Sequence, residues 1–289
     1  GFINHMIGCG WGSKRLGHLY GRWIDDDEGK AGVQVHAIYE PPQECTADEI
    51  RMLDDADGAA RVAKLVRSLG LTRVGVILAH PAREYAFTVN EVLLAARFHA
   101  EALADDADGA ACFVTMKARP VLESETEIEG VATVEAYQLT DQAVELCTRE
   151  PPAFAQSKND ARVAKTPADC CFVIEKKEQR KSTMEPFVSR IFDMARPFKA
   201  SVASNGFAVE NRPTEPQSSA TVAQYLRSRR SRGEPFGKSL ADFHLLLFLA
   251  THVLDVDVDV PVLCGHLQSG GAAELDGFRM MINCFAGLD

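Results

Sequence analysis

The chain has 289 residues, of which 46% are hydrophobic and 25% are charged, enough to build the core of one or two soluble domains. Its formal net charge of −10 excludes the class of nucleic-acid-binding proteins that depend on a concentrated basic surface. This charge instead fits a protein that meets other proteins.

The eight cysteines include no C-x-x-C pair, so the sequence has neither a zinc-ribbon nor a redox signature. Their scatter predicts a reducing compartment rather than a secreted disulfide framework. No signal peptide is visible, and the most apolar stretch, "FHLLLFLATHVL", is too short to span a bilayer and predicts a core helix. The first residue is Gly rather than Met, which suggests a piece of a longer protein.

The first half of the chain alternates between predicted strands and helices, which is typical of an α/β fold. Alternating or continuous apolar residues predict strands at 14–24, 33–42, 72–80, 111–118 and 131–140. Apolar residues at helical spacing predict helices at 46–55, 59–70, 88–106 and 141–150. Gly70 stands where a helix would end, and Thr88 with Glu91 has the spacing of a capping box.

The second half is less regular. Residues 169–177 and 198–203 resemble strands, and 185–197 resembles a helix, whereas the loops at 119–130 and 150–168 are too irregular to interpret. The polar, proline-containing stretch 208–220 predicts a linker, and the composition turns helical beyond it, at 220–231 and 239–254. We therefore expect an α/β domain at 1–210 and a small helical domain at 211–289.

Eight strings stand out along the chain: "GHLYGRW", "AIYEPPQE", "LGLTRVGVI", "EVLLAARF", "FVTM", "YQLT", "ENRP" and "DFHLLLFL". They occur in the order typical of the nuclear protein localization protein 4 family, so the chain resembles that family from near residue 1 to about residue 250. "AIYEPPQ" and "DFHLLLFL" are unusual strings and make the resemblance specific. The end of the chain matches the family poorly.

The resemblance implies a fold. The α/β part would be an MPN domain, which is the fold of the JAMM zinc isopeptidases, with a mixed sheet and flanking helices. The helical part would be the C-terminal domain of the family. Members of the family also carry an N-terminal ubiquitin-like domain and zinc fingers, whose cysteine spacing does not occur in this sequence.

The resemblance also implies partners. The family supplies a ubiquitin-recognition adaptor to the valosin-containing AAA ATPase, pairs with the ubiquitin fusion degradation protein, and recruits polyubiquitylated clients for ER-associated and proteasomal degradation. An unfolded ubiquitin segment lies along its MPN groove. We therefore expect ubiquitin chains and these two proteins as partners, with no nucleic acid, membrane span or cofactor. The implied location is the cytoplasm and nucleus, with the ER membrane surface reached through partners.

A working JAMM site combines a glutamate with the pattern H-x-H-P-x6-S-x2-D. Two histidines and the aspartate hold zinc and leave a position open for water, the glutamate takes the proton of that water, and the serine supports the oxyanion. In this chain His80 and Pro81 match the second histidine and the proline. Leu78 stands at the first histidine position and cannot bind a metal.

The remaining positions of the motif are also altered. Thr88 stands at the serine position, Glu91 at the aspartate position, and Lys14 at the position of the general base. At most two protein ligands remain where a catalytic zinc needs three, and the base is replaced by a cation that opposes zinc. The motif therefore predicts an inactive site with no catalytic residue and no metal.

These residues also have structural explanations that need no metal. A histidine before a proline is commonly a hydrogen-bonded residue at a strand end. Thr88 and Glu91 together form a helix N-cap and its capping-box partner, which stabilise a helix by about 1 kcal/mol. The arginine-rich stretch "YLRSRRSRG" at 225–233 is either a solvated helix end or a surface for an acidic partner.

Three hypotheses about function follow. The first is a non-catalytic adaptor that recruits polyubiquitylated clients to an AAA unfoldase and holds an extended ubiquitin segment in a groove beside a strand edge. The second is an atypical zinc isopeptidase that uses His80, Glu91 and an unidentified third ligand. The third is an architectural MPN subunit that does not contact ubiquitin.

Overall fold

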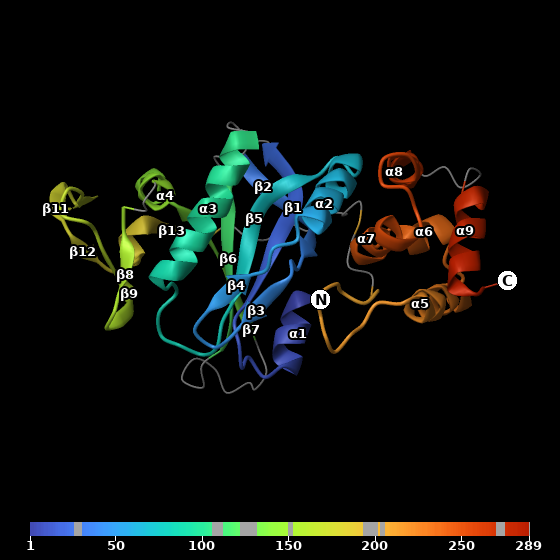
Figure 1. The fold of residues 1–289 in the computed structure, drawn as a ribbon, viewed down its shortest axis with the longest axis horizontal. Coiled ribbons are helices and arrows are strands. Elements are labelled where there is room, and N and C mark those ends of the chain that lie inside the picture. The colour runs from blue at the N-terminus through green and yellow to red at the C-terminus, as the bar shows by residue number, and fades with distance from the viewer. Residues whose placement is uncertain are drawn as a thin grey trace.

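The computed structural model describes residues 1–25, 31–105, 112–121, 132–149, 153–192, 202, 206–269 and 275–288. These residues form a mixed sheet with flanking helices, a group of short strands at one end and a helical C-terminal region at the other (Figure 1). The predicted fold class is confirmed. No helix among the described residues is long and apolar enough to cross a membrane.

The main sheet has six strands in the order β13-β7-β6-β5-β1-β2. β5 and β6 are parallel, and every other neighbouring pair in this sheet is antiparallel. The strands are β1 (Arg15–Asp25), β2 (Ala31–Tyr39), β5 (Thr72–Ala79), β6 (Val114–Pro120), β7 (Ala132–Leu139) and β13 (Val188–Ile191). β5 is interior to the sheet, which explains why its residues are almost continuously apolar.

The smaller strands belong to three separate sheets. They are β3 (Gln43–Cys45) with β4 (Ile50–Met52), β8 (Ala155–Ser157) and β12 (Lys181–Ser182) on either side of β9 (Asp160–Lys165), and β10 (Phe172–Ile174) with β11 (Lys177–Gln179). The helices are α1 (Phe2–Gly8), α2 (Ala56–Ser68), α3 (Val89–Asp105), α4 (Asp141–Thr148), a 3-10 turn (Glu185–Phe187), α5 (Ser219–Ser231), α6 (Phe236–Leu240), α7 (Phe243–His252), α8 (Asp259–Ser269) and α9 (Asp276–Ala286).

Helices cover both faces of the main sheet because successive residues of its strands point to opposite sides. Val76 and Leu78 of β5 pack with α3 and α4, whereas Ile77 and Ala79 pack with α1. A third apolar cluster joins α2 and the end of β2 to α7, so the C-terminal helices lie beside α2 (Figure 1). The predicted domain division at residue 210 stays a prediction.

Two predicted helices are wrong. Residues 46–55 form the turn and second strand of the β3–β4 hairpin, because the Gln43 side chain bonds the backbone N–H and C=O of Leu16 and attaches this hairpin to β1. Residues 185–191 form a 3-10 turn and β13, because β13 completes the sheet by pairing with β7. The rest of that predicted helix after residue 192, and most of the predicted strand at 198–203, lie outside the described residues.

The predicted helix at 239–254 is divided between α6 and α7. Asp242 is the N-cap of α7 and accepts hydrogen bonds from the backbone N–H groups of His244 and Leu245, at 3.0 and 3.1 Å. The predicted strand at 169–177 is shorter than expected, because Glu175 and Lys176 take left-handed conformations in the turn between β10 and β11. The predicted helices at 59–70 and 220–231 are confirmed, and those at 88–106 and 141–150 are confirmed up to residues 105 and 148, with residues 106 and 150 outside the described part of the chain.

The segment predicted as a linker holds the helical region against the sheet. Glu40, at the end of β2 and 1% exposed, forms ion pairs with Arg15 and Arg212, and its backbone C=O accepts the Asn211 side chain at 2.8 Å. The backbone N–H of Glu40 in turn donates to the Glu210 carboxylate at 3.0 Å. We call Glu40, Arg15, Glu210, Asn211 and Arg212 the junction network.

The junction network reaches α7 through one histidine. His244 Nδ1 lies 2.7 Å from Glu210 Oε2, and both side chains are buried. Burial lowers the pKa of His244, but the Glu210 carboxylate outweighs this effect, so the pKa is raised above its ordinary value. The sheet, the irregular segment and α7 are thus connected by buried charges that satisfy one another.

We predict that Arg212→Met lowers the free energy of unfolding by about 3 kcal/mol, because removing one partner leaves buried carboxylate charge poorly compensated. Urea denaturation of the parent and the variant measures this loss. Lys64→Met is the control, because Lys64 pairs with Asp257 at the exposed surface, and it should change stability by less than about 1 kcal/mol. Equal losses of unfolding free energy in the two variants would show that the junction network stabilises the fold no more than an exposed ion pair does.

Candidate functional site

The six motif positions come together where β5 ends and α3 begins. His80 follows the last residue of β5, Pro81 follows His80, and a loop leads to Thr88, directly before α3. Leu78 lies within β5 and is fully buried. Lys14 directly precedes β1, whose Arg15 pairs with Ala79 of β5 in the antiparallel register. The sheet therefore brings Lys14 to the same edge as His80.

Thr88 and Glu91 form the predicted capping box. The Thr88 hydroxyl accepts a hydrogen bond from the backbone N–H of Glu91 at 3.3 Å, and Glu91 Oε2 accepts one from the backbone N–H of Thr88 at 3.1 Å. These bonds satisfy two N–H groups that the first turn of α3 would otherwise leave unpaired. They also fix the direction of the Glu91 carboxylate, which is 3% exposed.

Three cations surround that carboxylate. Lys14 Nζ lies 3.0 Å from Glu91 Oε1, Lys117 Nζ lies 2.9 Å from Glu91 Oε2, and Arg83 donates to both oxygens at 3.1 and 2.6 Å. We call these four residues the Glu91 cluster. Burial raises the pKa of the Glu91 carboxyl, but the three cations outweigh it and hold that pKa well below its usual value.

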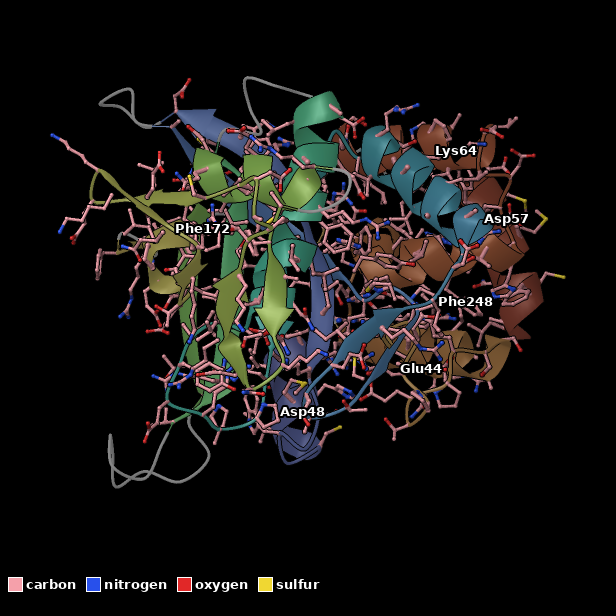
Figure 2. All side chains as sticks on the ribbon, turned by 60° about the vertical axis from the view of Figure 1, so that its left-hand side comes forward. Glu44, Asp48, Asp57, Lys64, Phe172 and Phe248 are labelled. Carbon is pink, nitrogen blue, oxygen red and sulfur yellow. The ribbon has the colours of Figure 1, made fainter. Side chains whose placement is uncertain are left out.

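The Glu91 cluster connects four parts of the fold. Lys14 comes from the start of β1, Arg83 from the loop after β5, Glu91 from α3 and Lys117 from β6. Lys14 also donates to the backbone C=O of Asp48 at 2.7 Å, which attaches the turn of the β3–β4 hairpin to the cluster. Figure 2 shows Asp48 at that turn.

Lys117 is the most deeply buried of the cations. Burial lowers its pKa to about 7, although the Glu91 carboxylate raises it. Its ammonium also lies 5.0 Å from the centre of the Phe87 ring, a favourable cation–π distance. The Glu91 carboxylate and the Phe87 ring thus both favour the charged form of this buried amine.

His80 lies beside the cluster in its neutral form. Its Nδ1 donates to the backbone C=O of Pro81 at 2.7 Å, so Nε2 carries a lone pair, and that buried atom has no hydrogen-bond partner in the described part of the chain. Burial, followed by the positive charges of Lys117 and Arg83, lowers the pKa of His80 to about 3. The described residues contain no group of three or more His, Cys, Asp or Glu side chains that could hold a metal.

Sequence reasoning identified Lys14 and Glu91 but missed two members of the cluster, Arg83 and Lys117. A signal for Lys117 existed, since it interrupts the apolar strand "FVTMKA", where a buried cation requires a carboxylate partner. No comparable signal singles out Arg83 among the other charged loop residues. Which carboxylate faces Lys117 depends on the parallel pairing of β5 with β6, which is a long-range contact.

Clefts open on both sides of the Glu91 cluster. A cleft of about 420 Å³ lies between the loop after β5 and the turn joining β8 to β9, and one of about 780 Å³ lies between α3, α4 and the β3–β4 hairpin. Lys14 and Asp48 line both. A further cleft of about 680 Å³ between α2 and α3 shares Arg97 and Glu101 with the second one.

Within the described residues, no strand pairs with the outer edge of β4 in the β3–β4 hairpin, and this edge lies beside these clefts. The hairpin's outer hydrogen bonds run from Thr46 N to Glu49 O and from Leu53 N to Pro42 O, both at 3.0 Å. Because hydrogen-bonded and non-bonded pairs alternate in antiparallel strands, the backbone groups of Ile50 and Met52 point away from β3. Ile50 lines the 780 Å³ cleft and Met52 lines the 680 Å³ cleft.

Together, the mixed sheet, its flanking helices and this site define an α/β protein with a buried, ion-paired glutamate in the first turn of α3. Residues 15–151 match the sequence profile described as the NPL4 family. The chain belongs to this family. It is 30% identical to NPL4-like protein 1 of Arabidopsis thaliana, an alignment that covers 99% of this chain and 64% of the relative.

Two other relatives share a lower identity with this chain and are covered over a smaller part of their own length. The nuclear protein localization protein 4 homolog of Dictyostelium discoideum is 29% identical over 98% of this chain and 45% of its own length. The homolog of Homo sapiens is 26% identical over 83% of this chain and 45% of its own length. The chain therefore spans about half to two thirds of the length of these relatives.

We predict that Glu91→Gln lowers the free energy of unfolding by about 3 kcal/mol, because it leaves three neighbouring cations without their shared carboxylate. Urea denaturation at neutral pH measures the change. Glu101→Gln is a matched control on the same helix, since its ion pairs with Arg73 and Arg97 are partly exposed. A loss of less than about 1 kcal/mol is expected for this control. If Glu91→Gln is equally mild, the carboxylate does not hold the cluster together.

A second prediction concerns acid stability. His80 titrates near pH 6.5 when unfolded and near 3 when folded, so the unfolded state binds more protons between these values. Its contribution to stability is therefore present above pH 6.5 and lost as the pH falls toward 3. His80→Gln should reduce the slope of unfolding free energy against pH by up to about 1.4 kcal/mol per pH unit. Parallel curves of unfolding free energy against pH for the parent and His80→Gln would contradict the assignment of His80 as a buried neutral histidine.

Proposed function

We propose that the chain acts as a non-catalytic, ubiquitin-binding substrate adaptor of the valosin-containing AAA ATPase. Membership of the NPL4 family supports a role as a cofactor of that ATPase. In this proposal the chain recruits polyubiquitylated clients, together with the ubiquitin fusion degradation protein, in the cytoplasm and nucleus and at the ER membrane surface. It presents an extended ubiquitin segment to the unfoldase.

The observation that carries this proposal is the open edge of β4 beside connected clefts. The outward N–H and C=O groups of Ile50 and Met52 offer hydrogen bonds to an added strand, which is how many proteins bind extended peptides. Leu93 and Leu94 of α3 line the cleft beside Ile50 and supply apolar contacts for alternate side chains. Strand addition requires an extended segment, and in this proposal an unfolded part of ubiquitin supplies it.

The Glu91 cluster supports the non-catalytic half of the proposal. In this proposal the six motif residues (Lys14, Leu78, His80, Pro81, Thr88 and Glu91) occupy the positions of a JAMM site, and the carboxylate at the metal-binding position is neutralised by cations. A divalent ion entering here would meet the positive charges of Lys14, Arg83 and Lys117. The same contacts stiffen the wall between two clefts, which suits a peptide-binding groove.

A backbone-directed variant tests the groove. Met52→Pro removes an outward N–H without removing a hydrogen bond to β3, and proline is tolerated at such edge positions. Binding of purified ubiquitin chains to the full 289-residue chain should weaken by up to about tenfold, corresponding to one lost backbone hydrogen bond. Met52→Ala keeps the N–H and should bind more nearly like the parent. If Met52→Pro binds ubiquitin chains as tightly as the parent, β4 is not the binding edge.

Metal analysis separates this proposal from an atypical zinc isopeptidase. After brief exposure to zinc and removal of the excess, the purified chain should contain no stoichiometric zinc by elemental analysis. Zinc near one ion per chain, lost on His80→Ala, would instead favour an isopeptidase. An architectural role would be favoured if the chain copurified with the ATPase but retained no ubiquitin.

A further inference from the structure

A concentrated group of cations lies at the end of α5, on a protein whose formal net charge is −10. Arg227, Arg230 and Arg232 are exposed and form no ion pair with the residues that the structure describes. Arg229 is paired with Glu234 at 3.0 Å. Four arginines within six residues repel one another, and among the described residues only Arg229 forms an ion pair with a carboxylate.

The helix dipole explains only part of this group. Cations in the last turn of a helix are stabilised by its partly negative C-terminal end, and Arg229 and Arg230 lie in that turn. Arg227 precedes the turn, and Arg232 follows the last residue of α5. The excess of positive charge therefore extends beyond the positions that the helix itself favours.

A cleft of about 880 Å³ lies directly beside these cations, between α1, the segment 206–216 and α5. Arg229 lines it from α5, Arg232 lines it from just after that helix, and Arg212 lines it together with its ion-pair partner Glu215. Phe207, Val209 and Tyr225 form its apolar floor, although they are only 4%, 4% and 8% exposed. The cleft shares no lining residue with the clefts around the Glu91 cluster, so it is a separate surface.

The cationic wall of this cleft is held in place. The Arg229 guanidinium lies 4.9 Å from the centre of the Tyr225 ring and is fixed by its ion pair with Glu234. The Tyr225 hydroxyl in turn donates to the backbone C=O of Ser239 at 3.0 Å. Opposite, Gly206 has a φ of +100°, and a β-carbon there would lie 3.9 Å from Arg229 Nη2. Residues other than glycine are strained at this positive φ, so position 206 carries no side chain into the cleft.

We propose that this basic cleft, defined by Phe207, Val209, Arg212, Tyr225, Arg229 and Arg232, binds an acidic extended segment of a partner protein. One apolar side chain of the segment packs against Phe207 and Tyr225, while its carboxylates face Arg232 and the flanking Arg227 and Arg230. Charge complementarity favours an acidic partner, because the unpaired arginines gain the carboxylates that they lack within the described chain. An apolar anchor also distinguishes such a segment from nucleic acid, whose binding would need a broader basic surface than this strongly acidic protein offers.

Fluorescence anisotropy with a labelled synthetic peptide tests the proposal. The probe contains a run of glutamates on each side of one phenylalanine and is titrated with the full 289-residue chain at low salt. We expect saturable binding that weakens several-fold when sodium chloride rises from about 50 to about 300 mM, because exposed charge pairs are screened. The triple variant Arg227→Gln/Arg230→Gln/Arg232→Gln should bind about tenfold more weakly, from several modest charge contacts.

Two matched controls make the result specific. Arg67→Gln removes an exposed arginine beside the cleft between α2 and α3 and should bind the probe like the parent. A peptide with glycine in place of phenylalanine should bind more weakly than the probe. The proposal is overturned if the triple variant keeps the affinity of the parent, if the glycine peptide binds equally well, or if single-stranded RNA displaces the probe at lower concentration than the unlabelled peptide does.

Discussion

The architecture depends on how the fold neutralises two buried carboxylates. Glu91 holds the start of β1, the loop after β5, α3 and β6 at one edge of the sheet, and Glu40 holds the end of β2 against the segment that leads to α7. Each carboxylate is shared by cations from distant parts of the sequence. A carboxylate that is buried and fully paired confines its partners to one geometry, because any rearrangement would leave an uncompensated charge in a low-dielectric interior.

Local interactions explain what could be predicted from the sequence. The capping box of Thr88 and Glu91 spans three residues, and β5 is apolar almost throughout, so both could be recognised without knowledge of the fold. The motif positions around His80 were found through the resemblance, and the structure brings Lys14 to Glu91. The interpretation of these positions as a degenerate JAMM site remains a proposal.

Long-range interactions explain what could not be predicted. The β3–β4 hairpin has helical spacing of its apolar residues, but the contact of Gln43 with Leu16 attaches it to the sheet as strands. β13 forms because β7 offers it an edge from almost fifty residues earlier in the chain. The partners of Lys117 and Arg212 are likewise set by tertiary pairing. The break before α7, in contrast, could have been predicted from the sequence. Asp242 stands directly before an apolar run, and an aspartate in that position commonly caps a helix.

The Glu91 cluster also limits how this site can evolve. Building the metal centre of a JAMM site here would require at least a histidine at Leu78, a carboxylate at Lys14 and the loss of the Lys117 charge. A histidine at 78 alone would place a polar ring at a fully buried apolar position, and a carboxylate at 14 alone would set two negative groups side by side. Every single step is therefore destabilising before any metal can compensate for it. In the proposed descent from a JAMM site, the interlocked ion pairs therefore act as a ratchet, because a hydrolytic activity, once lost, does not return by gradual substitution.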